Sequence, residues 1–282
     1  MPTATLDGIA TYYETHGTGT PILMCAPGGF DATIDKWRTA SAWTGIDAVQ
    51  ALGAEHTVIL YDRRECGQSR GRIEPLTWVS YARHGKALLD HLKIDSAWIM
   101  GGCMGCSVAL AFGVTYPEAA RGLLLHWPVG GYRWKVNSRE RFTRHYNFTK
   151  QNGLGAVVAR ARGGKSFWME PEGGPWAGEI ARSEEFAERF ASQNLERYLG
   201  IVFTTGQTLF DRDTAPGAEP EEVMGVDLPA LIIPGDDSSH ATSGAHYLRE
   251  LLPKADFWNV MPPEQATQKV CNRFLEFCRE HG

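Results

Sequence analysis

The sequence lacks the features that mark membrane, fibrous and disordered proteins. The 282-residue sequence has no run of ~20 uninterrupted apolar residues, the length that a membrane-spanning helix needs. It holds no internal repeat and no low-complexity tract. Its contents of 43% hydrophobic and 22% charged residues are those of folded globular domains. We therefore expect a chain that folds around a large core.

Long runs of one charge are absent as well. The chain has 28 Lys and Arg against 33 Asp and Glu, a formal net charge of −5, and its basic residues are scattered. Nucleic acid and anionic membranes are therefore not expected as partners. A small-molecule substrate is expected instead. The oligomeric state is left open, with a homodimer as one option.

Secretion, disulfide and cofactor signals are missing too. Met1 to Thr11 has no basic segment followed by an apolar one, and six cysteines in so long a chain indicate free thiols, so we expect a cytoplasmic protein. Cys103 and Cys106 have C-x-x-C spacing, but no second Cys or His pair follows at the distance of a zinc finger. The third glycine of a dinucleotide fingerprint is absent after Gly101 and Gly102. We expect no metal and no cofactor.

Short apolar runs alternate with helical patterns along the chain, and most of the runs are apolar without alternation, which is typical of strands covered on both faces. The runs are 21–25, 57–61, 97–100, 122–125, 229–233 and 257–260, and the helical patterns are 78–92, 104–116, 244–252 and 265–279. A hairpin of 3–6 and 9–14, joined by Asp7 and Gly8, is expected to precede them. This order predicts an α/β fold with a mostly parallel, eight-stranded sheet flanked by helices.

One long segment breaks this alternation. Residues 130–227 contain no convincing strand but include a helical pattern at 183–199. We predict an inserted helical cap at 130–227, with residues 1–129 and 228–282 forming the core. The segment contains aromatic residues that could line an apolar pocket or simply attach the cap to the core, and arginines that could meet a substrate carboxylate or lie on solvated helix faces. They are Trp134, Phe142, Tyr146, Phe148, Trp168, Trp176 and Phe203, and Arg133, Arg139, Arg144 and Arg160.

Cys103 stands at a candidate nucleophile position. It lies between an expected strand and an expected helix, within Gly101-Gly102-Cys103-Met104-Gly105. A nucleophile elbow needs this strand-turn-helix context, and it needs glycine two residues to either side because a side chain there would collide with neighbouring backbone. Cys106, one turn farther along, is expected to be a packing residue.

At this point the sequence resembles the α/β-hydrolase superfamily, in four segments that occur in the family's order. The elbow is one of them. The others are Gly28-Gly29-Phe30 followed by Trp37, which is similar to the oxyanion segment; Tyr61 to Ser69, which is similar to the D-x-R-G-x-G-x-S loop with Glu65 where Gly is usual; and Leu231 to Asp237, which resembles the seventh strand and its acid-bearing turn.

The resemblance implies roles for several residues. Cys103 would attack a carbonyl as a thiolate, in the place where the family usually has Ser, an arrangement that resembles the dienelactone hydrolases. The backbone N–H groups of Phe30 and Met104 would form the oxyanion hole. A thiol needs a nearby base or the positive end of a helix to ionise at neutral pH.

The catalytic base does not follow the family pattern, because no His follows the expected eighth strand until His281. His240, in the loop after the seventh strand, is the first candidate, with Asp237 as the acid that orients it. His126, which ends the strand beside the elbow strand, is the alternative. The remaining histidines have the pattern of exposed residues, although His84 could border the site. They are His16, His56, His84, His91, His145 and His246.

These features predict a hydrolase that uses Cys103 on a small ester, lactone or related carbonyl substrate beneath an aromatic-lined cap. Two alternatives stay open. One is a lyase, decarboxylase or acyltransferase on the same scaffold, and the other is a ligand-binding protein without catalysis.

Overall fold

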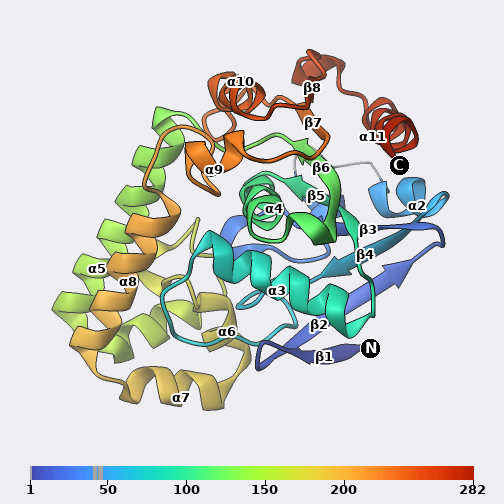
Figure 1. Cartoon of the computed structure of the whole chain (residues 1–282). Helices are drawn as coiled ribbons and strands as arrows, with labels where there is room; N and C mark the ends of the chain where they lie inside the picture. The colour runs from blue at the N-terminus through green and yellow to red at the C-terminus, as the bar shows by residue number, and fades with distance from the viewer. Residues whose placement is uncertain (1, 41–42, 44–46) are drawn as a thin grey trace.

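A single eight-stranded sheet runs through the residues that the computed structural model describes, which are 2–40, 43 and 47–282. The strand order is β1-β2-β4-β3-β5-β6-β7-β8 (Figure 1). Strand β2 is antiparallel to both of its neighbours, β1 and β4, and the pairings from β4 to β8 are parallel. The strands are β1 (Thr3–Leu6), β2 (Ile9–His16), β3 (Thr20–Cys25), β4 (His56–Tyr61), β5 (Ala97–Gly102), β6 (Ala120–His126), β7 (Ala230–Ile233) and β8 (Ala255–Phe257). The predicted fold class, a mostly parallel eight-stranded sheet, is confirmed.

The opening hairpin forms as predicted. Asp7 and Gly8 join β1 to β2 with φ angles of 48° and 72°. Positive φ at both central residues suits a tight turn whose twist matches that of the two strands. At the opposite edge, β8 begins two residues earlier than expected and ends at Phe257, and it pairs only with β7.

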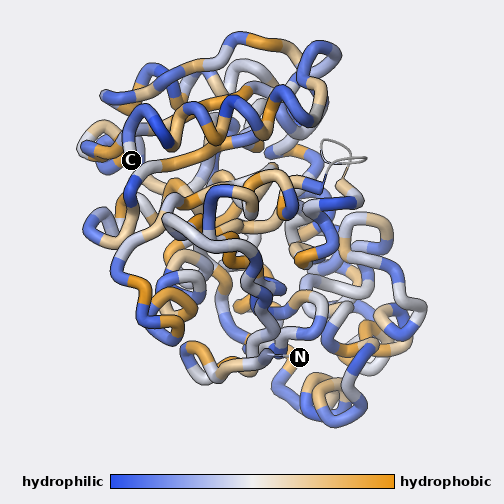
Figure 2. Tube along the Cα trace, turned by 90° about the vertical axis from the view of Figure 1, so that its right-hand side faces the viewer, coloured by the Kyte–Doolittle hydropathy of each residue, from blue (hydrophilic) through white to orange (hydrophobic). Residues whose placement is uncertain are grey.

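Helices cover both faces of the sheet, so that alternate strand residues belong to two separate cores. Leu23 packs on one face with α3 (Trp78–His91), α4 (Met104–Thr115) and α10 (Thr242–Leu251), whereas Ile22 and Met24 pack on the other with α2 (Ala48–Gly53) and α11 (Thr267–His281). The short helix α1 (Lys36–Thr39) adds Trp37 to the second core. Figure 2 shows the mixed hydrophilic and hydrophobic colouring of the helix that ends at the C-terminus, which buries one face against the sheet.

The chain between β6 and β7 is helical. It forms α5 (Tyr132–Ala161), α6 (Ala177–Arg182), α7 (Glu184–Ser192), α8 (Leu195–Leu209) and α9 (Pro220–Met224), and α5 packs along α8 at one side of the sheet (Figure 1). Gly153, with φ of 77°, interrupts the regular geometry of α5. The division into a core and a cap at 130–227 stays a prediction.

Within the described part of the chain, no helix combines the length and the apolar character needed to cross a bilayer.

Candidate active site

Cys103 occupies a sharp turn between β5 and α4. Its φ and ψ angles are 54° and −125°, a conformation that side chains other than glycine rarely adopt. A Cβ atom on Gly101 would lie 2.4 Å from the carbonyl oxygen of Gly105, and one on Gly105 would lie 2.0 Å from that of Cys25. The two glycines of the predicted elbow are therefore required sterically.

The Cys103 side chain borders a cavity of about 300 Å³. The backbone N–H groups of Met104 and Gly28 donate hydrogen bonds to its sulfur. Residues from the turn after β3, the elbow, the segment after β6 and the loop after β7 line the cavity, namely Gly28, Gly29, Cys103, Met104, Trp134, Asn137, Ser138, Arg141, Trp168, Ser238, Ser239 and His240. The volume is at the small end of the ~300–1,000 Å³ typical of ligand sites.

His240 and Asp237 come from one loop after β7 and face each other. Nδ1 of His240 lies 2.8 Å and 2.9 Å from the two carboxylate oxygens of Asp237. The same carboxylate accepts the backbone N–H groups of Ser239 and His240, at 2.8 Å and 2.9 Å. The parallel bridge between His240 and Gly130 attaches the loop to the chain that follows β6. These contacts hold the imidazole in one orientation, and His240 borders the same cavity as Cys103.

Electrostatics couple Cys103 to His240. Burial alone would raise the pKa of the Cys103 thiol, but the nearby His240 imidazolium, together with the Met104 and Gly28 amides, holds that pKa below its ordinary value. Among the described residues, Nε2 of His240 has no hydrogen-bond partner. Burial alone would lower the pKa of His240, but the Cys103 thiolate and Asp237 raise it to about 10. The hydrogen bond from His240 lowers the pKa of Asp237 to about 2. The two charges stabilise each other, so the arrangement favours a thiolate beside an imidazolium.

The chain is similar to known proteins both in part of its sequence and in its fold. Residues 21–158 match the family model described as alpha/beta hydrolase fold. The described chain superposes on a meta-cleavage product hydrolase (CumD) from Pseudomonas fluorescens with a TM-score of 0.65, at 19% identity, covering 100% of this chain and 98% of that one. An enol-lactonase from Burkholderia xenovorans gives a TM-score of 0.61, at 19% identity, over 99% and 100%.

The chain has the α/β-hydrolase fold. The matched residues 21–158 are just under half of the chain, and the solved structures share its fold over nearly its whole length.

The curated relatives share only part of their length with this α/β-hydrolase-fold chain. A putative carbamate hydrolase, RutD, of Azorhizobium caulinodans is 34% identical over 44% of this chain and 43% of its own. A homoserine O-acetyltransferase of Thermus thermophilus is 31% identical over 47% of this chain and 37% of its own. The match thus spans less than half the length of either relative.

The structure separates the two histidines that the sequence offered as the base. His240 lines the cavity with Cys103. His126 is buried behind it, with its ring 4.5 Å from that of Trp43 and stacked on Trp127, and burial lowers the pKa of His126 to about 3. His126 is therefore a core residue that does not border the cavity.

Three other histidines that were expected to be exposed are buried, which corrects the sequence interpretation. His84 hydrogen bonds the Thr11 hydroxyl at 2.7 Å, His145 hydrogen bonds the Tyr198 hydroxyl at 2.7 Å, and His56 contacts the Thr20 carbonyl at 3.0 Å. Each finds a polar partner within the protein, so these positions pack in spite of their polar character. None of the three borders the cavity at Cys103.

Of the two predicted oxyanion donors, Met104 lines the cavity, and the role of the Phe30 backbone N–H stays a prediction. The Phe30 ring is buried against Phe142, Phe167 and Trp168, with centroid distances of 5.7, 5.2 and 5.7 Å. The second amide that contacts the Cys103 sulfur belongs to Gly28.

Side chains from outside the turn hold its carbonyl groups. The indole N–H of Trp168 donates to the Gly28 carbonyl at 3.1 Å, and the buried Arg63 guanidinium donates to the Gly29 carbonyl. Gly29 has φ of 58°, and a Cβ there would lie 2.4 Å from the Trp168 ring. Trp168 thus packs directly on the loop that carries the Gly28 amide.

Sequence reasoning missed the face of α5 that borders the cavity. Trp134, Asn137, Ser138 and Arg141 line it, at spacings of three, four and seven residues that place them on one side of a helix. That spacing is a readable signal, but it identifies a face only when the neighbouring elements are known. None of the four arginines predicted from the sequence is among the described residues that line the cavity at Cys103. Arg144 and Arg160 pair with Glu172, and Arg139 donates to the Phe210 carbonyl. Arg133 borders a separate pocket beside the loop after β7.

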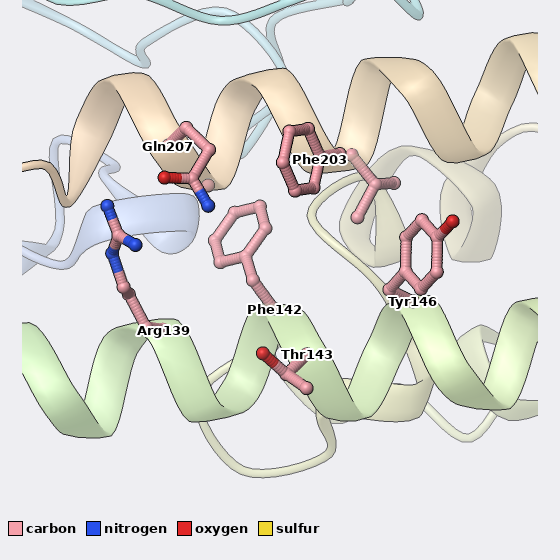
Figure 3. A pocket seen from close by; sticks show the side chains of 8 residues that line it. Arg139, Phe142, Thr143, Tyr146, Phe203 and Gln207 are labelled. Carbon is pink, nitrogen blue, oxygen red and sulfur yellow. The ribbon is translucent and has the colours of Figure 1, made fainter.

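The aromatic residues of the insertion divide between the two roles left open by the sequence. Trp134 and Trp168 line the cavity at Cys103. Trp176 is buried and donates to the Arg72 carbonyl at 3.0 Å, which attaches the insertion to the core. Phe142, Tyr146 and Phe203 line a second cavity of about 320 Å³ between α5 and α8 (Figure 3). No Cys, Ser or His is among the described residues that line this second cavity.

Cys106 is buried, as the sequence predicted. Its thiol lies 3.1 Å from the Gly101 carbonyl and 3.2 Å from the His126 carbonyl, and burial raises its pKa well above the ordinary value. It therefore stays a neutral packing residue beneath the elbow. Among the described residues, no group of three or more Cys, His, Asp or Glu side chains gathers as a metal site.

Proposed function

We propose that this protein is a hydrolase that uses the Cys103 thiolate against the carbonyl carbon of a small ester or lactone. The observation that carries the proposal is the convergence of Cys103, His240 and Asp237 at one cavity, together with amide donors at the sulfur. A nucleophile, a base that is oriented by a carboxylate, and oxyanion donors are the parts that acyl transfer needs.

In the first half of the reaction, Cys103 Sγ bonds to the carbonyl carbon and the carbonyl oxygen becomes an oxyanion. The backbone amides of Met104 and of the turn after β3, where the sequence predicts Phe30 as the donor, stabilise that charge. When the tetrahedral intermediate collapses, the bond to the leaving oxygen breaks and the His240 imidazolium protonates the departing alcohol. A thioester with Cys103 remains.

In the second half, neutral His240 takes a proton from water, and the resulting hydroxide attacks the thioester carbon. Collapse of this second intermediate releases the carboxylic acid and restores the thiolate and imidazolium pair. Asp237 stabilises the imidazolium in both halves, because its carboxylate accepts the Nδ1 hydrogen of His240.

The relatives support this chemistry without defining the substrate. One is named a carbamate hydrolase, and the structures with the same fold include an enol-lactonase and a meta-cleavage product hydrolase. The homoserine O-acetyltransferase favours a second candidate, in which an alcohol replaces water as the acceptor of the acyl group. Both candidates share the thioester intermediate. Cytoplasmic location, a homodimer and the absence of nucleic-acid and membrane partners stay predictions.

The experiment is rapid mixing with 4-nitrophenyl acetate. We expect a burst of nitrophenolate close to one equivalent per active chain, and mass spectrometry of the quenched protein should place one acetyl group on Cys103. Cys103→Ala should give neither. Cys278→Ala is the matched control, because that thiol lies on α11 in the core on the other face of the sheet and should leave the burst intact.

Turnover in heavy-oxygen water separates the two candidates. Hydrolysis incorporates one labelled oxygen into the released acid, whereas acyl transfer to an added alcohol produces an unlabelled ester. A wild-type protein that shows no burst and no acetyl group on Cys103 would refute the proposal.

A further inference from the structure

Arg141 is a cation in the cavity that lacks a carboxylate partner. It lies on α5 one turn beyond Ser138 and Asn137, and all three residues line the cavity with Cys103. Its Nε donates to the Trp168 carbonyl at 3.2 Å and its Nη1 to the Asn137 carbonyl at 2.9 Å. No ion pair joins it to any Asp or Glu among the described residues, and its Nη2 has no hydrogen-bond acceptor among them.

Among the arginines of α5, only Arg141 both lacks a carboxylate partner among the described residues and lines the cavity with Cys103. Arg144 and Arg160 both pair with Glu172, at 3.1 Å and 3.0 Å, and they do not border the cavity. Arg141 instead is half-buried, is held by two carbonyls, and has its guanidinium 5.5 Å from the Trp168 ring. A cation that is partly removed from water and fixed in place, with a donor left over, gains most from an anionic ligand with matching geometry.

Two neutral polar groups stand beside that free donor. The Ser138 hydroxyl and the Asn137 carboxamide have no hydrogen-bond partner among the described residues, although Ser138 is only 3% exposed. Both side chains lie on the same face of α5 as Arg141. Together, the three residues offer a guanidinium donor and two further donors to one small planar anion.

We propose that Arg141, with Ser138 and Asn137, forms a carboxylate-binding subsite, so that the substrate is a small ester or lactone that carries a carboxylate group. This inference rests on the proposed function, since it names the substrate class of the same cavity. Arg141 positions the substrate through its carboxylate, while the carbonyl to be attacked lies at Cys103. The small cavity limits the substrate to a compact molecule.

The first test compares two esters that differ in charge, mono-(4-nitrophenyl) adipate and 4-nitrophenyl pentanoate. We expect wild-type kcat/KM to be at least tenfold higher for the anionic ester, mainly through a lower KM. Arg141→Met should reduce this preference by tenfold or more, and Arg141→Lys should retain part of it, because charge survives while the planar fork is lost. Arg139→Met is the matched control, since that arginine is on the same helix and also lacks a carboxylate partner, but it faces the second cavity.

The second test does not depend on ester hydrolysis. Iodoacetate and iodoacetamide both alkylate a thiolate by displacing iodide, and they differ chiefly in charge. We expect the rate constant for iodoacetate divided by that for iodoacetamide to be about tenfold larger at Cys103 than for free glutathione. In Arg141→Met this ratio should fall to the glutathione value. High salt should lower the wild-type ratio.

The outcomes separate the two proposals. If neither ester is hydrolysed but the alkylation ratio depends on Arg141, the hydrolase proposal is wrong and the carboxylate subsite stands. Turnover of both esters with no charge preference would overturn the subsite alone. Equal loss on both esters in Arg141→Met, with an unchanged preference, would show a structural role and would also overturn it. The wild-type ratios decide the matter even if a variant does not fold.

Discussion

The indole N–H of Trp168 donates to the carbonyl of Gly28 at 3.1 Å, and thereby connects the inserted segment to the turn whose amide contacts the nucleophile. The same ring lies over Gly29, where only a glycine leaves it room. Arg63 holds the next carbonyl of the turn from inside the core. The turn after β3 is therefore held from two sides, which suits a segment whose amides must meet developing charge without reorganising.

Trp168→Phe should lower kcat/KM for 4-nitrophenyl acetate by about two- to tenfold, because a hydrogen bond with a net value of ~0.5–1.5 kcal/mol is lost while the ring still fills its place. Steady-state kinetics measure this, and the reduction is expected in kcat. Trp176→Phe is the control: its indole N–H donates to the Arg72 carbonyl away from the cavity, so it should reduce stability and leave kcat/KM within about twofold. Equal kinetic effects of the two variants would contradict the role of Trp168.

The reactivity of Cys103 should depend on pH through His240. The pKa of the thiol lies below its ordinary value of 9.0, so the midpoint of the pH dependence of alkylation by iodoacetamide should lie below pH 9. In His240→Asn, burial without the imidazolium should move that midpoint to higher pH. Ester turnover should fall again as the imidazolium deprotonates near pH 10, whereas alkylation should not. An unchanged alkylation profile in His240→Asn would rule out the ion pair.

The free energy of unfolding should also depend on pH through His240 and Asp237. His240 has its pKa raised from 6.5 to about 10, so its contribution is complete below pH 6.5 and is lost as pH rises towards 10. The pKa of Asp237 is lowered from 3.8 to about 2, so its contribution is complete above pH 3.8 and is lost as pH falls towards 2. The loss of unfolding free energy in Asp237→Asn should therefore be largest between these limits. Urea denaturation across this range measures it, and a loss that is constant with pH would contradict the assignment.

Gly105→Ala should be strongly destabilising, because the new Cβ would lie 2.0 Å from the Cys25 carbonyl oxygen and would force the strand and helix apart. We expect a loss of at least ~1–3 kcal/mol of unfolding free energy, the usual cost of overpacking. Gly200→Ala is the matched control, since that helical glycine in α8 has open space around it and should gain ~0.5–1 kcal/mol. Thermal and urea unfolding of both variants test the contrast, which fails if the two behave alike.

Glu65 stands where the family motif usually has Gly, and it explains a local departure from that motif. It has φ of 68°, is buried, and accepts from Arg64 Nε at 2.8 Å. Glu65→Gly should relieve ~1–2 kcal/mol of backbone strain but remove one of the two carboxylates that pair with the buried Arg64, the other being Glu74, and we expect the lost pairing to cost more than the strain relieved. Urea denaturation should show a net loss. Glu184→Gln, which removes an exposed pair with Arg162, should cost under ~1 kcal/mol. A neutral or stabilising Glu65→Gly would contradict this account.

Local features of the sequence were sufficient for the elements and for the sharp turn at Cys103. The hairpin at Asp7 and Gly8, the buried strands and the elbow depend on residues that are close along the chain, such as the glycines two positions to either side of Cys103. Those constraints act over a few residues of backbone, so they are readable without the fold. The predicted eight-stranded sheet follows from the alternation of such elements.

Contacts between distant segments were decided only by the tertiary structure. The sequence could place His240 after β7 and His126 after β6, but not choose between them, because burial of one and access of the other to Cys103 depend on how three loops pack. Burial of His84 and the approach of Gly28 to Cys103 depend likewise on partners far along the chain. The position of Arg141 beside the cavity could not be predicted from the sequence for the same reason. A cation can serve as a ligand site only when folding places it beside a cavity with no carboxylate to neutralise it.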